Sequence, residues 1–134
     1  MNTNIVSILS KYPQPICPLK HSFSDGVYVR EVTMPADSLL VGKTHRTKHL
    51  NMISKGSCIL LDRETGKRTL IQAPYTFESE AGVSKVVYII EECVWSTIHV
   101  TDETDLDKLE ELLIQKEVEH GIHHGRNGSI IGSY

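Results

Sequence analysis

Three histidines are the residues of this chain best suited to chemistry, namely His45, His49 and His99. A neutral imidazole binds zinc, iron, nickel or copper, and three imidazoles around one open coordination position make a transition-metal centre. The alternative is that these histidines are hydrogen-bonded in a pocket or exposed. Which of the two holds depends on whether the fold brings the three rings together.

Strand alternation predicts which neighbours share a face with these histidines. In a strand beginning at His49, Asn51 lies on the same side as His49. In a strand over 94–100, Trp95 lies on the same side as His99, and the opposite set is nearly all apolar. We expect that apolar set to pack in the core, and we expect His99 to face a ligand cavity.

Two lysines near the histidines predict a cationic pocket. Lys43 lies two residues before His45, and Lys85 opens a predicted strand over 85–91. An ammonium group repels a metal ion unless burial lowers its pKa strongly, whereas it attracts a carboxylate or a phosphate. The alternative is that both lysines are solvated at the rim of the pocket.

The elements that would position these residues are short strands. Runs rich in β-branched and aromatic residues recur after Gly26, each closed by turn residues. These runs lie at 27–34, 38–41, 49–54, 57–62, 68–72, 75–79, 85–91 and 94–100. Seven or eight strands joined by tight turns, such as hairpins at 55–56 and 64–66, predict an all-β sandwich or barrel.

The two ends of the chain differ from this pattern. Three prolines within 1–24 predict an irregular N-terminal arm before a barrel at 25–101. Leucines at three- and four-residue steps, after several acidic and capping residues, predict one amphipathic helix over about 104–118, within a segment bounded at 102–119. We expect 120–134, which includes His120, His123 and His124, to be a flexible or docking tail.

Composition limits the function. With 134 residues, a formal net charge of -3 and a pI near 6.1, the chain predicts one domain without bulk affinity for nucleic acid. It lacks an apolar run long enough to span a membrane, and we predict a cytoplasmic protein. Cys17, Cys58 and Cys93 are widely spaced, which predicts reduced and mostly buried thiols.

The segment 42–56 resembles the first motif of the cupin superfamily, a His-x-His pair followed by a glutamate and then a glycine. Aligned on Gly56, the first histidine position falls on Lys43, the second on His45 and the glutamate position on His49. The second motif, Pro-x-Gly followed by a histidine, resembles 80–85, where the histidine position is Lys85. Two of the four usual metal positions therefore carry a metal-binding side chain. The whole chain also resembles small cupin-like proteins encoded by bacteriophages.

This resemblance implies a cupin-type jelly-roll barrel that assembles as a dimer or higher homo-oligomer. We predict that its pocket binds a small, phosphate- or carboxylate-bearing molecule. The ligand-binding residues would be Lys43, His45, His49, Asn51, Lys85, Trp95 and His99.

Two other functions remain open at this stage. One is a metal-dependent enzyme, a dioxygenase, isomerase or hydrolase, with one Zn, Fe, Ni or Mn ion on His45, His49 and His99. The other follows from the phage resemblance: a viral protein of the host cytoplasm that sequesters or degrades a host nucleotide signal, or a structural accessory of the virion. Catalytic residues are not assigned.

Overall fold

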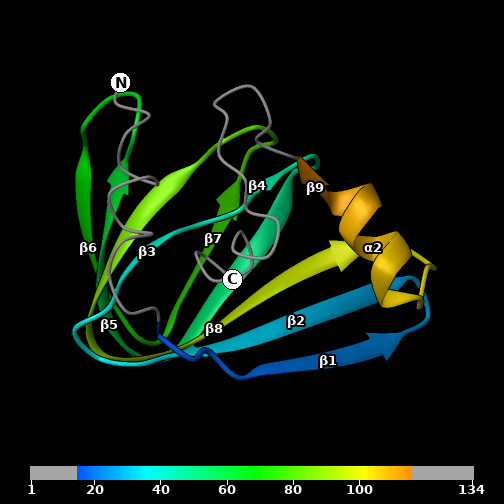
Figure 1. The fold of residues 1–134 in the computed structure, drawn as a ribbon, viewed down its shortest axis with the longest axis horizontal. Helices are drawn as coiled ribbons and strands as arrows, with labels where there is room; N and C mark the ends of the chain where they lie inside the picture. The colour runs from blue at the N-terminus through cyan, green and yellow to red at the C-terminus, as the bar shows by residue number, and fades with distance from the viewer. Residues whose placement is uncertain (1–14, 116–134) are drawn as a thin grey trace.

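A computed structural model describes residues 15–115 of the chain, and these form nine strands and one short helix (Figure 1). In chain order the elements are β1 (Leu19–Ser24), β2 (Val27–Met34), β3 (Leu39–Val41), β4 (Thr44–His45), β5 (His49–Asp62), β6 (Arg68–Gln72), β7 (Tyr75–Ser79), β8 (Lys85–Val100), α2 (Leu106–Leu113) and β9 (Ile114–Gln115). The prediction of an all-β chain with one helix is confirmed. In the described part of the chain, no helix is both long and apolar enough to cross a bilayer.

Seven of the strands form one antiparallel sheet in the order β1-β2-β8-β5-β6. The two longest strands, β5 and β8, lie at its centre and each has a second partner, since β7 also pairs with β5 and β3 with β8. The sheet therefore bends around its interior, and within 15–115 its edges are not closed by hydrogen bonds (Figure 1). Strands β4 and β9 form a separate pair beside α2.

The core fills the concave side of the bent sheet. In β2, alternate residues Tyr28, Arg30, Val32 and Met34 are buried. The register Val32↔Trp95 sets the inward face of β8, because residues opposite each other on paired strands share a face. Other fully buried side chains of this core are Leu40, Ile53, Cys58, Val87, Ile89 and Cys93.

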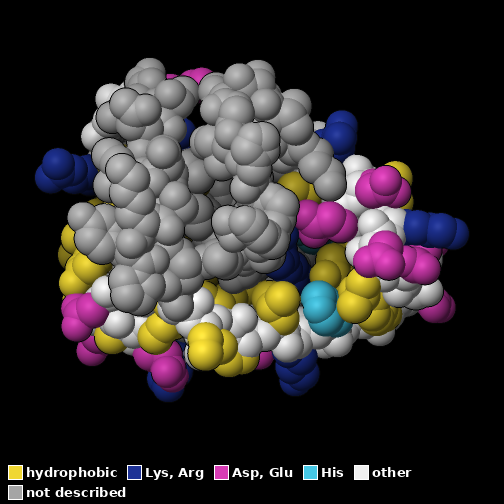
Figure 2. All heavy atoms as spheres, in the orientation of Figure 1, with side chains coloured by type: hydrophobic (Ala, Val, Ile, Leu, Met, Phe, Trp, Pro, Cys, Tyr) yellow, Lys and Arg dark blue, Asp and Glu magenta, His cyan; other side chains and the backbone are white. Residues whose placement is uncertain are grey.

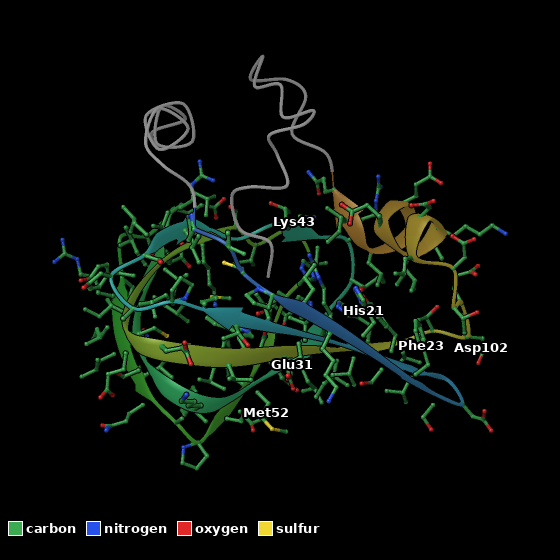
Figure 3. The ribbon with its side chains drawn as sticks, turned by 60° about the horizontal axis from the view of Figure 1, so that its bottom comes forward. His21, Phe23, Glu31, Lys43, Met52 and Asp102 are labelled. Carbon is green, nitrogen blue, oxygen red and sulfur yellow. The ribbon has the colours of Figure 1, made fainter. Side chains whose placement is uncertain are left out.

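This register corrects the prediction for the last strand. Trp95 and His99 face inward, as expected for a cavity wall, but the apolar alternate set faces outward. Val100 at the end of that set is 89% exposed. On the neighbouring strand β5, Met52 likewise points away from the interior (Figure 3). The packed face of β8 is therefore the face that carries His99.

Two predicted strand boundaries are also wrong. The sequence predicted a hairpin at Lys55 and Gly56, whereas β5 runs continuously from His49 to Asp62 with a bulge near Gly56. Gly56 has a φ of +91°, and a Cβ atom there would lie 2.1 Å from the carbonyl oxygen of Glu92. The glycine is therefore required by the close approach of β8 and by the bulge. The predicted break near residue 92 is likewise absent from β8.

The ends of the described chain show two further differences. Strand β1 lies within the segment expected to be an irregular arm, where it pairs with β2 as a hairpin. Helix α2 is shorter than predicted: its N-cap is Asp105, and Ile114 leaves the helix for the extended conformation of β9. Leu109 and Leu113 pack against Tyr28, and acidic side chains gather on the outer side of α2 (Figure 2). Residues 120–134 lie outside the described residues.

All three cysteines lie within 15–115 and none forms a disulfide. Cys58 and Cys93 are fully buried, which agrees with the predicted reduced thiols, and Cys17 is half-buried. A side-chain hydrogen bond with Cys93, together with burial, raises the pKa of the Cys58 thiol. Cys58 therefore serves as an apolar core residue.

Candidate metal centre

The three predicted histidines converge in the interior. Ring centroids are 4.1 Å apart for His45 and His49, 4.9 Å for His49 and His99, and 5.1 Å for His45 and His99. All three side chains are at most 9% exposed. One nitrogen of each ring lies within 4.8 Å of the other two, so the three can serve as ligands of one ion.

Each histidine is positioned by a different part of the fold. His45 lies in β4, where it pairs with Ile114 of β9, and its carbonyl accepts a backbone hydrogen bond from Gly82 at 2.9 Å. His49 begins β5, and His99 lies near the end of β8 opposite Tyr28. Residues far apart in the sequence therefore meet because β5 and β8 are neighbours at the centre of the sheet.

The hydrogen bonding of His49 sets its tautomer. Its Nδ1 lies 3.0 Å from the carbonyl oxygen of Thr47, which can only accept. The Nδ1–H of neutral His49 therefore donates to Thr47 and leaves Nε2 with a free lone pair. This is the arrangement by which a metal-bound histidine is usually oriented.

Burial keeps all three imidazoles neutral. It lowers the pKa of His45 to about 2, with further contributions from His49, His99, Arg30 and Lys43. Burial also lowers the pKa of His99 to about 4, and it lowers the pKa of His49. Since only a neutral imidazole binds a metal, the ligands are ready without the loss of a proton at neutral pH.

The residues present fit a bound transition-metal ion. The buried Nδ1 atoms of His45 and His99 have no hydrogen-bond partner among the described residues, and an enclosed unpaired nitrogen is costly. Two nitrogens bound to one ion at about 2.1 Å lie at most about 4.2 Å apart, so a set within 4.8 Å needs only small ring rotations.

A cavity of about 20 Å³ adjoins the cluster, which is room for about one water-sized group. Its lining includes Asn51, Trp95 and Thr97 together with His45 and His49. Asn51 accepts a hydrogen bond from Trp95 Nε1 at 3.0 Å and donates to Ser79 Oγ at 2.8 Å, so its amide is engaged within the wall. The hydroxyl of Thr97 is buried without a partner in residues 15–115 and is available to a group in the cavity.

The two lysines at the motif's histidine positions also line this cavity. Lys43 Nζ lies 3.3 Å from a carboxylate oxygen of Glu110 on α2. Lys85 Nζ lies 5.2 Å from the ring centroid of Phe77, and burial lowers its pKa. The structure thus brings Lys43, Asn51, Lys85 and Trp95 around two of the histidines, while His99 completes the cluster from β8.

One residue of the site was missed from the sequence. Arg30 is 9% exposed, and its charge contributes to the lowered pKa values of His45 and His99. The signal was present in β2, where alternation places Arg30 on the same face as Tyr28 and Val32. That face was not recognised as the inner one.

We expect the buried histidines to make the metal-free protein sensitive to acid. Their pKa values are lower in the folded state than the ordinary 6.5, so below pH 6.5 the unfolded chain binds more protons. The free energy of unfolding should therefore fall as the pH decreases from 6.5 toward 4, by up to about 1.4 kcal/mol per pH unit for each histidine. Urea denaturation after chelation, at pH 7, 6 and 5, measures this slope.

A His45→Asn variant is the control for this prediction, because it should show a smaller slope over the same range. Equal stability of the wild type at pH 7 and pH 5 would contradict the neutral state assigned to the three rings.

No family model and no curated protein matches the sequence of this chain. Its structure is similar to a cupin-2 domain protein of Shewanella frigidimarina, with a TM-score of 0.52, 16% identity, and coverage of 75% of this chain and 94% of that one.

Two other solved structures show the same likeness. An RmlC-like cupin family protein with a double-stranded β-helix fold, from Methanocaldococcus jannaschii, has a TM-score of 0.53 and 10% identity over 66% of this chain and 83% of that one. Salicylate 1,2-dioxygenase of Pseudoaminobacter salicylatoxidans has a TM-score of 0.59 and 7% identity over 84% of this chain and 34% of that one.

These comparisons do not bear on the phage resemblance, the cytoplasmic location or the homo-oligomer, which stay predictions. At such low identity the similarity concerns the fold. Together with the strand topology, it shows that this chain has an all-β fold of the cupin type, with a buried cluster of three histidines.

Proposed function

We propose that the chain binds one first-row transition-metal ion through His45, His49 and His99, and that the bound ion serves a reaction on a small molecule. The observation that carries the proposal is the convergence of three buried, neutral imidazoles within 4.8 Å. Three protein nitrogens leave coordination positions for water or a substrate, as catalytic metal sites require.

The size of the cavity favours a metal site that admits one coordinated group over a pocket that encloses a large ligand. About 20 Å³ accommodates a water-sized group and is far below the roughly 300 Å³ of ordinary ligand pockets. Lys43 is already paired with Glu110, which weakens the case for a lysine-based anion pocket. The same size weighs against a pocket that encloses a nucleotide.

When bound, the ion would act as a Lewis acid toward an oxygen-bearing group of the small molecule. The protein's own residues would orient the metal ligands and exclude bulk water from the site. Thr47 fixes the ring of His49 through its carbonyl oxygen. Asn51 and Trp95 close the wall beside the cluster through their mutual hydrogen bond, and the free hydroxyl of Thr97 can hold a bound water or substrate oxygen.

Elemental analysis tests this proposal. Because the ligand set is preformed and neutral, protein purified without a histidine tag should contain about one equivalent of a transition metal. Overnight chelation should remove that metal, and one equivalent of added ion should restore it with a rise in melting temperature. Metal below about a tenth of an equivalent, with no change in melting temperature on adding Zn, Fe(II), Ni or Mn, would contradict the proposal.

A further inference from the structure

Arg30 is a buried cation for which the described residues offer no partner. It lies on the inner face of β2 opposite Thr97, and it is 9% exposed. Within 15–115, no hydrogen bond and no ion pair joins its guanidinium to another residue. A guanidinium stays charged in proteins, and a buried charge without a partner is strongly unfavourable. Such a group indicates a site for a ligand of opposite charge.

Arg30 lies on the same inner face as the histidine cluster, since it is opposite Thr97, and Tyr28, its neighbour on that face of β2, is opposite His99. The charge of Arg30 contributes to the lowered pKa values of His45 on β4 and His99 on β8, and also of His21 on the neighbouring strand β1. The nitrogens of Arg30 are not among the fully enclosed unpaired atoms of the described residues, so they reach space that a ligand can enter. Thr97, opposite Arg30 on β8, lines the cavity beside the cluster, so an anion on Arg30 would lie on the same inner face as the three histidines.

The carboxylate that acts electrostatically on Arg30 is already engaged elsewhere. Glu110 influences the pKa of Arg30, yet its oxygens lie 3.3 and 3.5 Å from Lys43 Nζ. The Lys43 and Glu110 charges cancel, and the three histidines are neutral. Lys85 lies over the ring of Phe77 and acts on His49, whereas the charged or titratable groups that act on Arg30 are Tyr28 and Glu110. Arg30 therefore carries the one uncompensated charge on its side of the cluster among the described residues.

This charge balance selects the class of anion. One singly charged carboxylate neutralises Arg30 and matches the planar fork of its guanidinium through two parallel hydrogen bonds. A phosphate dianion would need a second cation beside Arg30, but Lys43 is paired with Glu110 and Lys85 lies over Phe77 and does not act on Arg30.

We propose that Arg30 binds the carboxylate of a small carboxylic acid, which is the substrate class of this site. The inference rests on the proposed function only in calling that molecule a substrate. The anion site itself requires no metal.

Arg30→Met tests the inference on metal-free protein, with Arg68→Met as a control because Arg68 is exposed on β6. At constant ionic strength, replacing chloride by 100 mM acetate should raise the melting temperature of the wild type and of the control by a few degrees. It should shift the Nε–H resonance of Arg30 in the wild type. The Arg30→Met variant should lose the thermal shift, and Arg30→Lys should bind acetate at least tenfold more weakly, because lysine keeps the charge and loses the fork.

A second readout separates ligand binding from a purely structural role. If Arg30 is kept for a ligand, Arg30→Met in chloride should melt at the same temperature as the wild type or higher, because an unpaired buried charge has been removed. A clear loss of stability in that variant would mean that Arg30 supports the fold, and would overturn the inference.

Three other outcomes would overturn it: no effect of acetate on the wild type, an acetate effect retained in Arg30→Met, or a larger effect of inorganic phosphate than of acetate. The two proposals can fail separately. Arg30→Met should still bind one equivalent of metal, so acetate binding without metal binding would contradict the proposed function alone, and metal binding without acetate binding would contradict this inference alone.

Discussion

Replacing His45 or His99 by alanine is expected to weaken metal binding at least 100-fold and to leave purified protein with less than a tenth of an equivalent. Either change removes one of three protein ligands, whereas loss of a mere supporting group around a metal site already costs about 10- to 100-fold. Competitive titration against a chromophoric chelator measures the affinity, and circular dichroism shows whether the variant is folded. The same loss is expected for His49→Ala.

His21→Ala is the matched control for these variants. His21 lies on β1 and is not part of the three-histidine cluster. Its Nδ1 forms a hydrogen bond of 2.8 Å with the hydroxyl of Tyr28. The His21→Ala variant should keep a full equivalent of metal. Equal metal loss in His21→Ala and His45→Ala would indicate an unspecific effect, and unchanged affinity in folded His45→Ala would contradict the ligand assignment.

Replacing Gly56 by alanine is expected to destabilise the protein by about 2–5 kcal/mol. The φ of +91° costs an alanine about 1–2 kcal/mol, and overpacking costs a further 1–3 kcal/mol. The overpacking is severe because the new Cβ would meet the carbonyl oxygen of Glu92, a backbone atom, at 2.1 Å. Urea denaturation of the purified variants measures the difference in the free energy of unfolding.

Gly82→Ala separates the cost of the positive φ from the cost of overpacking. Gly82 has a similar φ of +82°, but no heavy atom lies within 4 Å of a Cβ built there. The Gly82→Ala variant should therefore lose only the stability that the positive φ costs an alanine, about 1–2 kcal/mol. If the two variants were equally stable, the close contact between the bulge of β5 and β8 would not exist as described, and the central pairing of the sheet would be in doubt.

The strand pattern was readable from the sequence because alternation and β-branched residues depend on local structure. This reasoning correctly placed His49 and Asn51 on one inward face of β5. It failed at Lys55 and Gly56, where a glycine with positive φ was assigned to a turn. A bulge and a turn both require a residue that accepts a positive φ, and only the partner strand distinguishes them.

The site was predicted in part for the same reason. The cupin-like motif led to His45 and His49, and alternation led to His99, although the apolar face of β8 was assigned to the wrong side. Arg30 was missed because an arginine between apolar residues resembles a solvated position. Its burial depends on the packing of β2 against β8 and on the presence of α2 nearby, which the local sequence does not show.

X-ray absorption spectroscopy on tag-free protein reconstituted with one equivalent of zinc tests the central claim most directly, because the fine structure counts the imidazoles on the ion. The account predicts three imidazole nitrogens at about 2.0–2.1 Å and at least one further oxygen ligand, with one imidazole lost in His99→Ala. A spectrum with one imidazole or none, unchanged by that substitution, would contradict it.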